Sequence, residues 1–418
     1  MRSDFISNSS SNQKKPSDRP LSDIRVLAVE NFLAGPLASM WLGDAGADVV
    51  KVESPKEGDY SRQGSPSRSD DNGVNQGVAF LRSNRNKKSI ELDLKNPEGK
   101  RIFIQLAKQA DILVENLRPG TMDRLELGWD VLHRANPKLI YVAVSGFGHG
   151  DVLPSPYSDR PAFDIVGQAL GGLMYRPERA DDRPTYLGFS LADLQGGILA
   201  VQGALLALFQ RVRTGIGQKV DISLYDACLV LNELSITMYS ISGIKPEPGL
   251  HAITAPFGAY ETIDGYIVIA VLGEHIWKRF CEAIERPDLL DDDRFKDGIS
   301  RQRNIKALNH IIDPWLRTRH QDEVIQTLLA FGVPSSKIND VEDLLHCPHV
   351  AARKMILNID DPVWGRVAVT GNPIKMSGVA EAEISHPPLL GQHTDEVLRN
   401  WLDLDPVEIT ALRKNNVI

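Results

Sequence analysis

The stretch IRVLAVENFLAGPLASMWLGDAGADVVKVE, residues 24–53, decides the fold. Its two ends, residues 24–29 and 48–53, are short runs rich in Val, Ile and Leu, which predict buried strands. Residues 35–46 between them predict a helix. A strand, a helix and a second strand within about 30 residues form a βαβ unit, and this unit implies a parallel sheet.

The same pattern recurs further along the chain. Residues 89–94, 112–115 and 139–144 predict strands, and residues 97–110 predict a helix. We therefore expect an α/β fold with a Rossmann-like large domain built on a parallel sheet. In such sheets ligands bind beyond the carboxyl ends of the strands, which here are residues 31–35, 53–62, 116–120 and 145–150.

The length of 418 residues is enough for one large and one smaller domain. Residues 194–213 predict a helix with apolar residues nearly all round, which we expect to be buried. The predicted order is a disordered tail over residues 1–20, a large α/β domain over 21–235, a linker over 236–256, a smaller α+β domain over 257–350, and a return segment over 351–418 that completes the large domain.

The formal net charge of -8 and a pI near 5.7 argue against a general nucleic-acid or membrane-surface binder. No apolar run reaches the roughly 18 residues that a membrane-spanning helix needs. The three cysteines, Cys228, Cys281 and Cys347, have neither metal-site spacing nor an even disulfide set. We expect a cytoplasmic protein that binds no metal, no membrane and no nucleic acid.

Several catalytic motifs are absent from the sequence. The turn at residues 30–36 lacks the GxGxxG spacing that lets a backbone approach a dinucleotide pyrophosphate, so nicotinamide and flavin dehydrogenases are disfavoured. The phosphate-loop, HExxH and GxSxG motifs are absent too, so phosphate-loop, zincin and serine-hydrolase chemistry lose support.

One carboxylate, Asp193, lies where an irregular stretch enters the long apolar helix, in GFSLADLQGG at residues 188–197. A carboxylate at such a junction can attack an activated acyl group, because an aspartyl anhydride or thioester divides one difficult transfer into easier steps. Asp is also a preferred helix N-cap, which accepts hydrogen bonds from first-turn amides. Both interpretations stay open at this point.

Basic residues gather in RSNRNKK at residues 82–88, and Lys95, Arg118 and Arg124 lie at other predicted strand or helix ends. Such groups can hold the phosphates of an anionic ligand through charge-assisted hydrogen bonds. The alternative for the cluster is a solvated polar face. Arg118 and Arg124 flank a Pro-Gly turn just past a strand end, which favours a ligand-binding role for at least one of them.

Taken together, these segments resemble the family III CoA-transferases, a group that includes formyl-CoA:oxalate and carnitine CoA-transferases. The similarity extends from about residue 21 to residue 398. It is carried by AGP at residues 34–36, GADVVKVE at 46–53, NKKSIELDLK at 86–95, VENLRPGTMDRL at 114–125, TGIGQ at 214–218 and LLGQHT at 389–394. A single piece is a weak signal, whereas the ordered set is specific.

The resemblance implies a ring-shaped chain that forms an interlocked homodimer, with the active site between the large and small domains of different chains. CoA is then a substrate and a product, and no other cofactor is implied. Ser54 and Pro161 (or Arg160) depart from basic residues of some relatives, which affects adenine and phosphate contacts. The implied CoA-binding residues are Leu33, Ala34, Leu92, Asp93, Leu94, Lys95, Asn116, Leu117, Arg118 and Arg124.

Asp193 falls at the position of the family's nucleophilic aspartate. The resemblance implies transfer of CoA from an acyl-CoA thioester to a free carboxylic acid through aspartyl anhydride and aspartyl-CoA thioester intermediates. Asp164 aligns with an acidic family position and is expected to orient the first turn of the helix. Backbone amides near Gly196 and Gly197 are expected to stabilise the developing oxyanions.

α-Methylacyl-CoA racemase shares the family's fold and is the main alternative. Its proton transfer needs an acid/base pair on opposite faces of the substrate carbon, usually a His and an Asp. Phe163, which cannot exchange a proton, stands here in place of that His. A second alternative is a non-catalytic CoA-binding protein, and the acid at position 193 counts against it.

The acceptor is expected to be selected by a mobile loop at residues 61–76, by residues 175–186 and by residues 242–256. The segment YRPER at residues 175–179 offers a site for a second carboxylate, which favours a succinyl-CoA donor with a small dicarboxylic or hydroxy acid acceptor. Oxalate is disfavoured because KPEPGL, residues 245–250, replaces a glycine run of some oxalate-specific relatives.

Overall fold

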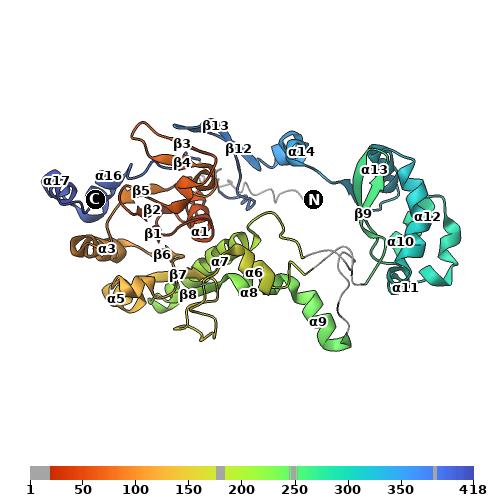
Figure 1. Cartoon of the computed structure of the whole chain (residues 1–418), viewed down its shortest axis with the longest axis horizontal. Coiled ribbons are helices and arrows are strands. Elements are labelled where there is room, and N and C mark those ends of the chain that lie inside the picture. The colour runs from red at the N-terminus through yellow and green to blue at the C-terminus, as the bar shows by residue number, and fades with distance from the viewer. Residues whose placement is uncertain (1–18, 176–183, 244, 246–250, 252, 380–383) are drawn as a thin grey trace, which may run out of the picture. The chain divides into compact units, whose positions relative to one another are not determined.

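The computed structural model describes residues 19–175, 184–243, 245, 251, 253–379 and 384–418, which divide into two units (Figure 1). The first unit contains the chain up to Gly171, Gly188–Leu231 and Lys354–Ile418, and the second contains Gly172–Leu187 and Asn232–Arg353. Most of the tail expected over residues 1–20 lies outside the described residues. The domain limits expected from the sequence stay a prediction.

A six-stranded parallel sheet forms the centre of the first unit, in the order β5-β2-β1-β6-β7-β8. The βαβ prediction is therefore confirmed, with Val26 of β1 paired to Val49 of β2 on one side and to Ile112 of β6 on the other. The strands are β1 (Arg25–Val29), β2 (Asp48–Glu53), β5 (Lys88–Glu91), β6 (Ile112–Glu115), β7 (Ile140–Ser145) and β8 (Lys219–Ser223).

Some helices of the first unit begin at a residue whose side chain accepts hydrogen bonds from their free amides. At the start of α3, for example, the Asn96 side chain accepts a hydrogen bond from Glu98 N, and Pro97 takes the first helical position. The helices are α1 (Ala34–Asp44), α2 (Val78–Leu81), α3 (Pro97–Gln109), α4 (Thr121–Arg124), α5 (Trp129–Ala135), α6 (Asp164–Leu170), α7 (Leu191–Thr214), α8 (Leu224–Leu229), α16 (Thr394–Leu402) and α17 (Pro406–Lys414).

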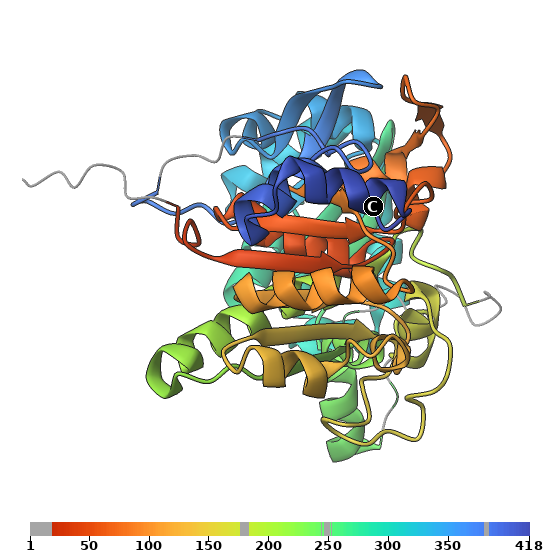
Figure 2. The same cartoon turned by 90° about the vertical axis from the view of Figure 1, so that its left-hand side faces the viewer.

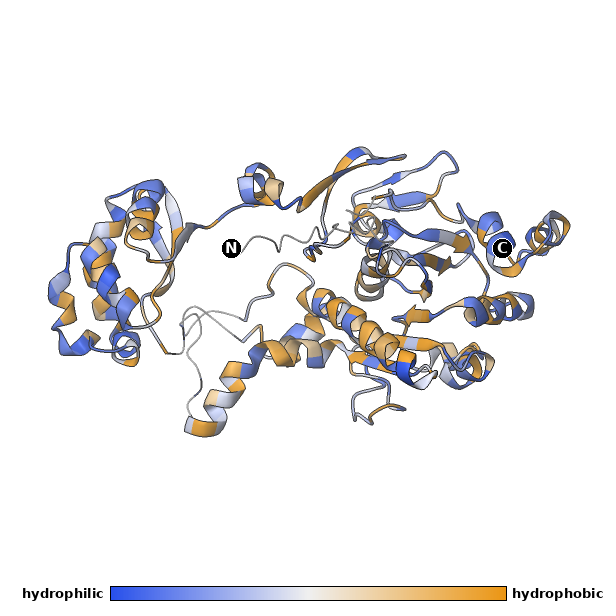
Figure 3. Cartoon of the chain, turned by 180° about the vertical axis from the view of Figure 1, so that it is seen from behind, coloured by the Kyte–Doolittle hydropathy of each residue, from blue (hydrophilic) through white to orange (hydrophobic). Residues whose placement is uncertain are grey.

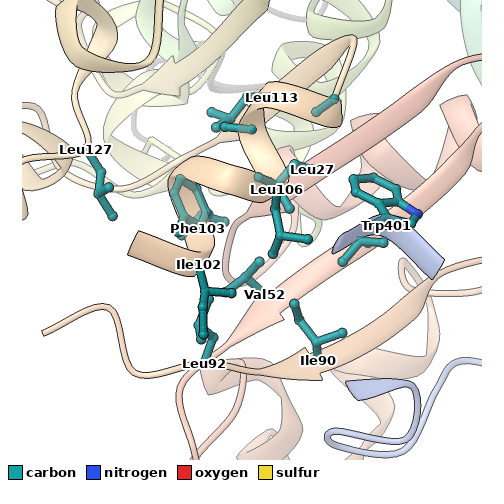
Figure 4. Close-up of a cluster of buried hydrophobic side chains, with 14 of the residues drawn as sticks. Leu27, Val52, Ile90, Leu92, Ile102, Phe103, Leu106, Leu113, Leu127 and Trp401 are labelled. Atoms are coloured by element: carbon teal, nitrogen blue, oxygen red, sulfur yellow. The ribbon is translucent and has the colours of Figure 1, made fainter. Parts of the chain in front are cut away.

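One face of the sheet is buried beneath α3, α5 and α16 (Figure 2). Burial of apolar surface is the main force that holds such layers together. Figure 4 shows side chains from the strands and these helices packed in one cluster, including Leu27, Val52, Ile90, Ile102, Phe103, Leu106, Leu113 and Trp401. The opposite face of the sheet is covered by α1 and α7, which pack against each other.

Helix α7 places a stripe of small residues against the rest of the unit. The buried members are Ala192, Gly196, Gly197, Ala200, Val201, Ala204 and Ala207. Figure 3 shows hydrophobic residues along this helix. Its larger apolar residues are exposed, with Leu206 at 64%, Phe209 at 61% and Val212 at 86%, so the expectation of a buried helix was wrong. By length and composition alone α7 is long and apolar enough to cross a membrane, although its sequence has no uninterrupted apolar run of that length; 39% of its most apolar 18 residues are buried.

The segment expected as a mobile loop at residues 61–76 contains regular structure. It includes most of the 3-10 helix η1 (Tyr60–Gln63) and of a hairpin of β3 (Ser67–Ser69) and β4 (Asn75–Gly77). Arg62 is fully buried, and its guanidinium bonds the Glu53 carboxylate at 2.7 Å. A second hairpin joins β12 (Ile356–Asp361) to β13 (Gly365–Thr370).

The second unit contains an antiparallel sheet, in the order β11-β10-β9, and mostly helices otherwise. Strands β9 and β10 form a hairpin that turns at Asp264-Gly265, since Gly265 pairs with Thr262. Helix α9 occupies the first part of the expected linker, and residues 244, 246–250 and 252 lie outside the described part. The elements are α9 (Glu233–Ser242), β9 (Phe257–Thr262), β10 (Gly265–Ala270), α10 (Glu274–Ala283), η3 (Pro287–Leu290), η4 (Asp293–Phe295), α11 (Gly298–Arg303), α12 (Ile305–Arg317), α13 (Gln321–Ala330), β11 (Ser335–Lys337), α14 (Val341–His346) and α15 (Pro348–Ala352), with η2 (Val230–Asn232) at the junction between the units.

Candidate active site

Asp193 is the third residue of α7, and Ser190 occupies the N-cap position. The N-cap interpretation of Asp193 was therefore wrong. The Ser190 side chain makes no capping hydrogen bond. Instead, Oδ1 of Asp164 accepts hydrogen bonds from the backbone amides of Ala192 at 2.7 Å and Asp193 at 3.3 Å. A carboxylate from α6 thus caps α7, which confirms the contact expected for Asp164 and leaves the Asp193 side chain out of the cap.

Gln168 completes this arrangement from the same helix as Asp164. Its Nε2 donates to Oδ2 of Asp164 at 2.7 Å and to the backbone oxygen of Phe189 at 2.9 Å. Both side chains are buried. They meet because residues four apart on a helix share a face. The role of Gln168 was not predicted from the sequence, although its spacing of four residues from an acidic residue was a readable signal.

The amides of the first turn of α7 are all occupied. Besides the two bonded to Asp164, Leu191 N donates to Phe189 O at 2.9 Å and Leu194 N donates to Ser190 O at 3.0 Å. Gly196 and Gly197 lie deeper in the helix, where amides have intrahelical acceptors, so their expected role as oxyanion donors was wrong.

The two glycines instead allow close packing. A Cβ atom on Gly197 would lie 2.8 Å from the backbone oxygen of Ala34, and one on Gly196 would lie 2.7 Å from Cδ2 of Leu224. The Leu224 side chain could move away from such a Cβ atom, whereas the Ala34 backbone could not do so without a shift of the helix. Gly197 therefore brings α7 against the start of α1, one turn beyond Asp193.

The Asp193 carboxylate is half-buried, and within the described residues no group hydrogen-bonds it. Burial, followed by the negative charge of Asp164, raises the pKa of Asp193 to about 7, against the lowering effect of Arg82. Both protonation states are therefore populated near neutral pH. A carboxylate without hydrogen-bond donors and with a raised pKa is a functional-site candidate, because its lone pairs are available to react.

Arg82 is the basic side chain that the structure places within electrostatic reach of Asp193. It follows α2, is exposed, and forms no ion pair with any described residue. Its neighbours differ, because Arg85 bonds Asp44 at 2.7 Å and Lys87 bonds Glu30 at 2.8 Å, all four side chains being buried. Residues 82–88 therefore form neither one phosphate-binding cluster nor one solvated face. The acids that pair with Arg85 and Lys87 lie far away in the sequence, so the segment itself did not predict these ion pairs.

The turn after β1 contains Leu33 and Ala34, two of the implied CoA-binding residues. Both are buried, so only their backbone groups are candidates to face a ligand. Asn31 N donates to Oδ1 of Asn116 at 2.8 Å, and Nδ2 of Asn116 donates to Asn31 O at 2.7 Å. The structure thereby joins the turns beyond β1 and β6, as expected for a ligand site at the carboxyl edge of the sheet.

The other candidates after β6 are Leu117, Arg118 and Arg124, of which Leu117 is held by Glu115. Its Oε2 accepts a hydrogen bond from Leu117 N at 2.8 Å, and burial raises the pKa of Glu115 to about 8. Arg118 is exposed, and Arg124 donates to the Thr121 hydroxyl at 2.8 Å while exposed. Both guanidinium groups are accessible to a phosphate, and their CoA-binding role stays a prediction.

Residues 92–95 follow β5, which is separated from β1 by β2. Leu92 is buried and Leu94 is partly buried against the same core. Asp93 N donates to Val417 O at 2.8 Å, and the Asp93 carboxylate accepts from Lys95 N at 2.9 Å. The structure thus brings together the candidates after β1 and β6, and it places these four at the edge strand of the same sheet.

Aromatic side chains lie beside the β1–α1 turn, a feature that the sequence argument did not find. The Phe32 ring lies 5.4 Å from that of Tyr60 and 5.8 Å from that of Phe163. Phe163, the residue that replaces the racemase His, is exposed. Ser54 and Pro161 are exposed as well. Among the described residues no group of His, Cys, Asp and Glu side chains is arranged to hold a metal ion.

The sequence model of the family described as CoA-transferase family III matches residues 21–394 of this chain. The chain belongs to this family. It is 37% identical to "Succinyl-CoA:mesaconate CoA-transferase" of Haloarcula hispanica, over 90% of this chain and 95% of that protein. It is 36% identical to "Succinyl-CoA--D-citramalate CoA-transferase" of Chloroflexus aurantiacus, over 98% of this chain and 100% of that protein.

Solved structures agree with the family. A CAIB/BAIF family protein from Brucella suis superposes with a TM-score of 0.79 at 31% identity, covering 92% of this chain and 100% of that one. The protein is accordingly a CoA-transferase, as the motif set predicted, and the relatives named above give no support to the racemase alternative.

Proposed function

We propose that the protein transfers CoA from succinyl-CoA to a small dicarboxylic or hydroxy acid, with Asp193 as the covalent nucleophile. The observation that carries the proposal is the environment of the Asp193 carboxylate. It is half-buried, free of hydrogen bonds from described groups, and presented by a helix turn whose amides Asp164 and backbone oxygens occupy. The donor follows from the named relatives, which use succinyl-CoA.

The chemistry divides into two exchanges. An ionised Asp193 oxygen bonds to the thioester carbonyl carbon and the C–S bond breaks, which leaves a mixed anhydride and CoA thiolate. The thiolate attacks the Asp193 carbonyl carbon, so the donor acid leaves with the bridging oxygen and an aspartyl-CoA thioester remains. The acceptor carboxylate then attacks this thioester, and the released thiolate attacks the acceptor carbonyl carbon. The products are the new acyl-CoA and an Asp193 that has gained one oxygen from the acceptor.

Arg82 is the group proposed to receive the acceptor carboxylate. The second exchange brings an anion to a place where Asp164 already supplies negative charge, and the first turn of α7 has no spare amide to offset it. An exposed guanidinium with no ion pair to a described residue is suited to this task, because Arg binds carboxylates through paired hydrogen bonds. Residues 176–179 of the segment first expected to do so lie outside the described part.

The CoA site is proposed at the carboxyl edge of the parallel sheet. The accessible cations Arg118, Arg124 and Lys95 support it. The proposed set remains Leu33, Ala34, Leu92, Asp93, Leu94, Lys95, Asn116, Leu117, Arg118 and Arg124. We also propose a reducing, cytoplasmic setting, which the absence of disulfides among the three free cysteines supports.

The interlocked homodimer implied by the family is part of the proposal. Support comes from the exposed apolar residues of α7, because contiguous exposed apolar surface marks an interaction site. Sedimentation of the purified chain should give twice the mass of one chain. A monomer at the concentrations of the activity assay would contradict the dimer.

The nucleophile is tested by isotope transfer. After turnover with an acceptor whose carboxylate carries heavy oxygen, the peptide that contains Asp193 should gain heavy oxygen, and hydroxylamine should trap Asp193 after incubation with acyl-CoA alone. Asp193→Ala should lower CoA transfer on the order of a thousandfold or more while CoA still binds. Asp226→Ala is the matched control, since Asp226 is also the third residue of its helix but is exposed.

Undiminished turnover of Asp193→Ala, or heavy oxygen absent from Asp193, would overturn the mechanism. A racemase would instead exchange the hydrogen next to the thioester with solvent deuterium and leave Asp193 unmodified. A non-catalytic CoA-binding protein would bind CoA without either change.

A further inference from the structure

Gln168 is a buried polar group at the start of the nucleophile's helix that the proposed mechanism does not use. Its two amide hydrogens have two acceptors, Oδ2 of Asp164 at 2.7 Å and the Phe189 backbone oxygen at 2.9 Å. Its Oε1 has no hydrogen-bond partner among the described residues. Since both partners only accept, the amide must present its nitrogen to them, and its orientation is fixed.

The two acceptors lie on either side of the entry into α7. Phe189 precedes the N-cap residue Ser190, and Asp164 holds the amides of Ala192 and Asp193. Gln168 therefore ties the segment before the helix and the cap of its first turn to one rigid point on α6. A displacement of either contact changes where the Asp193 carboxylate lies.

Gln168 is also electrically neutral. No described Lys, Arg or His forms an ion pair with Asp164, whose donors are the Gln168 amide and two backbone amides. The negative charge of Asp164 is thus not cancelled by a cation, and it acts on the adjacent Asp193. A lysine in place of Gln168 would donate to the same acceptors but would cancel this charge.

We infer that Gln168 is a positioning residue for Asp193: it locks the entry of α7 in place and does so without cancelling the charge of Asp164. This inference rests on the proposed function of Asp193. It predicts two separable effects, one on the rate of acylation through geometry and one on its pH dependence through charge.

Two variants of the full-length protein separate these effects. Gln168→Met keeps the length and shape of the side chain and removes both hydrogen bonds. It should slow single-turnover acylation of Asp193 by succinyl-CoA by about tenfold to a hundredfold, as a small misplacement of a reacting group does, with CoA binding unchanged. Gln168→Lys keeps donors for both acceptors, should retain most of the rate, and should move the acid limb of the pH profile to lower pH.

Wild-type protein that shows no modification at Asp193 would refute the proposed function itself. With wild-type modification established, the inference is overturned if Gln168→Met is acylated at the wild-type rate or if the profile of Gln168→Lys coincides with that of wild type. Should Gln168→Met not fold, the shorter amide of Gln168→Asn decides: it adds no charge and cannot reach both acceptors, so acylation slower than wild type with unchanged CoA binding supports the positioning role, and a wild-type rate overturns it.

Discussion

The acylation of Asp193 should accelerate as the pH rises through neutrality. The reacting form is the ionised carboxylate, so the sign is fixed: the rate falls below the pKa and levels off above it. Burial and the charge of Asp164 raise the pKa of Asp193 to about 7. One pH unit below the pKa, roughly a tenth of the carboxyl groups are ionised, so acylation should run about tenfold below its plateau.

Arg82 also affects how the rate of Asp193 acylation depends on pH. Its positive charge favours ionised Asp193 and lowers the pKa. Arg82→Gln removes that charge, so the pKa of Asp193 should rise and the acid limb should move to higher pH. Gln168→Lys should move it in the opposite direction. Opposite displacements from two substitutions cannot come from a general loss of stability.

The assay is rapid quench of enzyme mixed with saturating succinyl-CoA and no acceptor, followed by mass spectrometry of the peptide that contains Asp193. Saturation removes any pH dependence of CoA binding from the observed rate. A rate that is flat across neutral pH would refute the reasoning, because an aspartate with the ordinary pKa of 3.8 is fully ionised throughout this range.

Three further predictions concern the surroundings of the site. Arg82→Ala should raise the KM for the acceptor by about tenfold to a hundredfold, the value of a hydrogen-bonded charge, whereas Arg118→Ala should raise the KM for acyl-CoA instead; equal effects on both would contradict the assignment. Gly197→Ala should destabilise the fold by about 1–3 kcal/mol in chemical denaturation, because its Cβ meets the Ala34 backbone oxygen at 2.8 Å, while Gly258→Ala, with no atom within 4 Å of its Cβ, should not. Leu206→Glu should weaken the proposed dimer in sedimentation, and an unchanged mass would remove α7 from the interface.

The strands could be predicted because their signal is local. Residues 48–53 and 112–115 are strands residue for residue as predicted, since a run of buried apolar residues records its own environment. The strand predicted over residues 89–94 ends at Glu91 because Asp93 N bonds the distant Val417 instead of a neighbouring strand. That partner is more than 300 residues away and leaves no trace in the local pattern.

The site was predictable in part for the same reason. The motif around Asp193 identified the nucleophile candidate, but not that Asp164 caps its helix or that Gln168 holds the cap. The basic run at residues 82–88 looked like one functional cluster. Arg85 and Lys87 form ion pairs with buried acids 41 and 57 residues away, whereas Arg82 forms none with a described residue. This division depends on tertiary contacts that spacing does not encode.

The charges around Asp193 suit the two halves of the proposed reaction differently. Burial and the negative charge of Asp164 destabilise the ionised Asp193 carboxylate. Acylation converts that carboxylate into an uncharged carbonyl group, so both destabilising effects are removed when the covalent intermediate forms. The second half brings a new anion to the same place, where Arg82 is the described cation that offsets the charge of Asp164. Removing Arg82 should therefore slow the acceptor step more than acylation and let aspartyl-CoA accumulate. Gln168→Lys should keep most of the acylation rate but stabilise the free carboxylate relative to the covalent intermediate, and so leave more free Asp193. The steady-state fraction of modified Asp193 should thus move in opposite directions in the two variants, which a uniform loss of activity cannot produce.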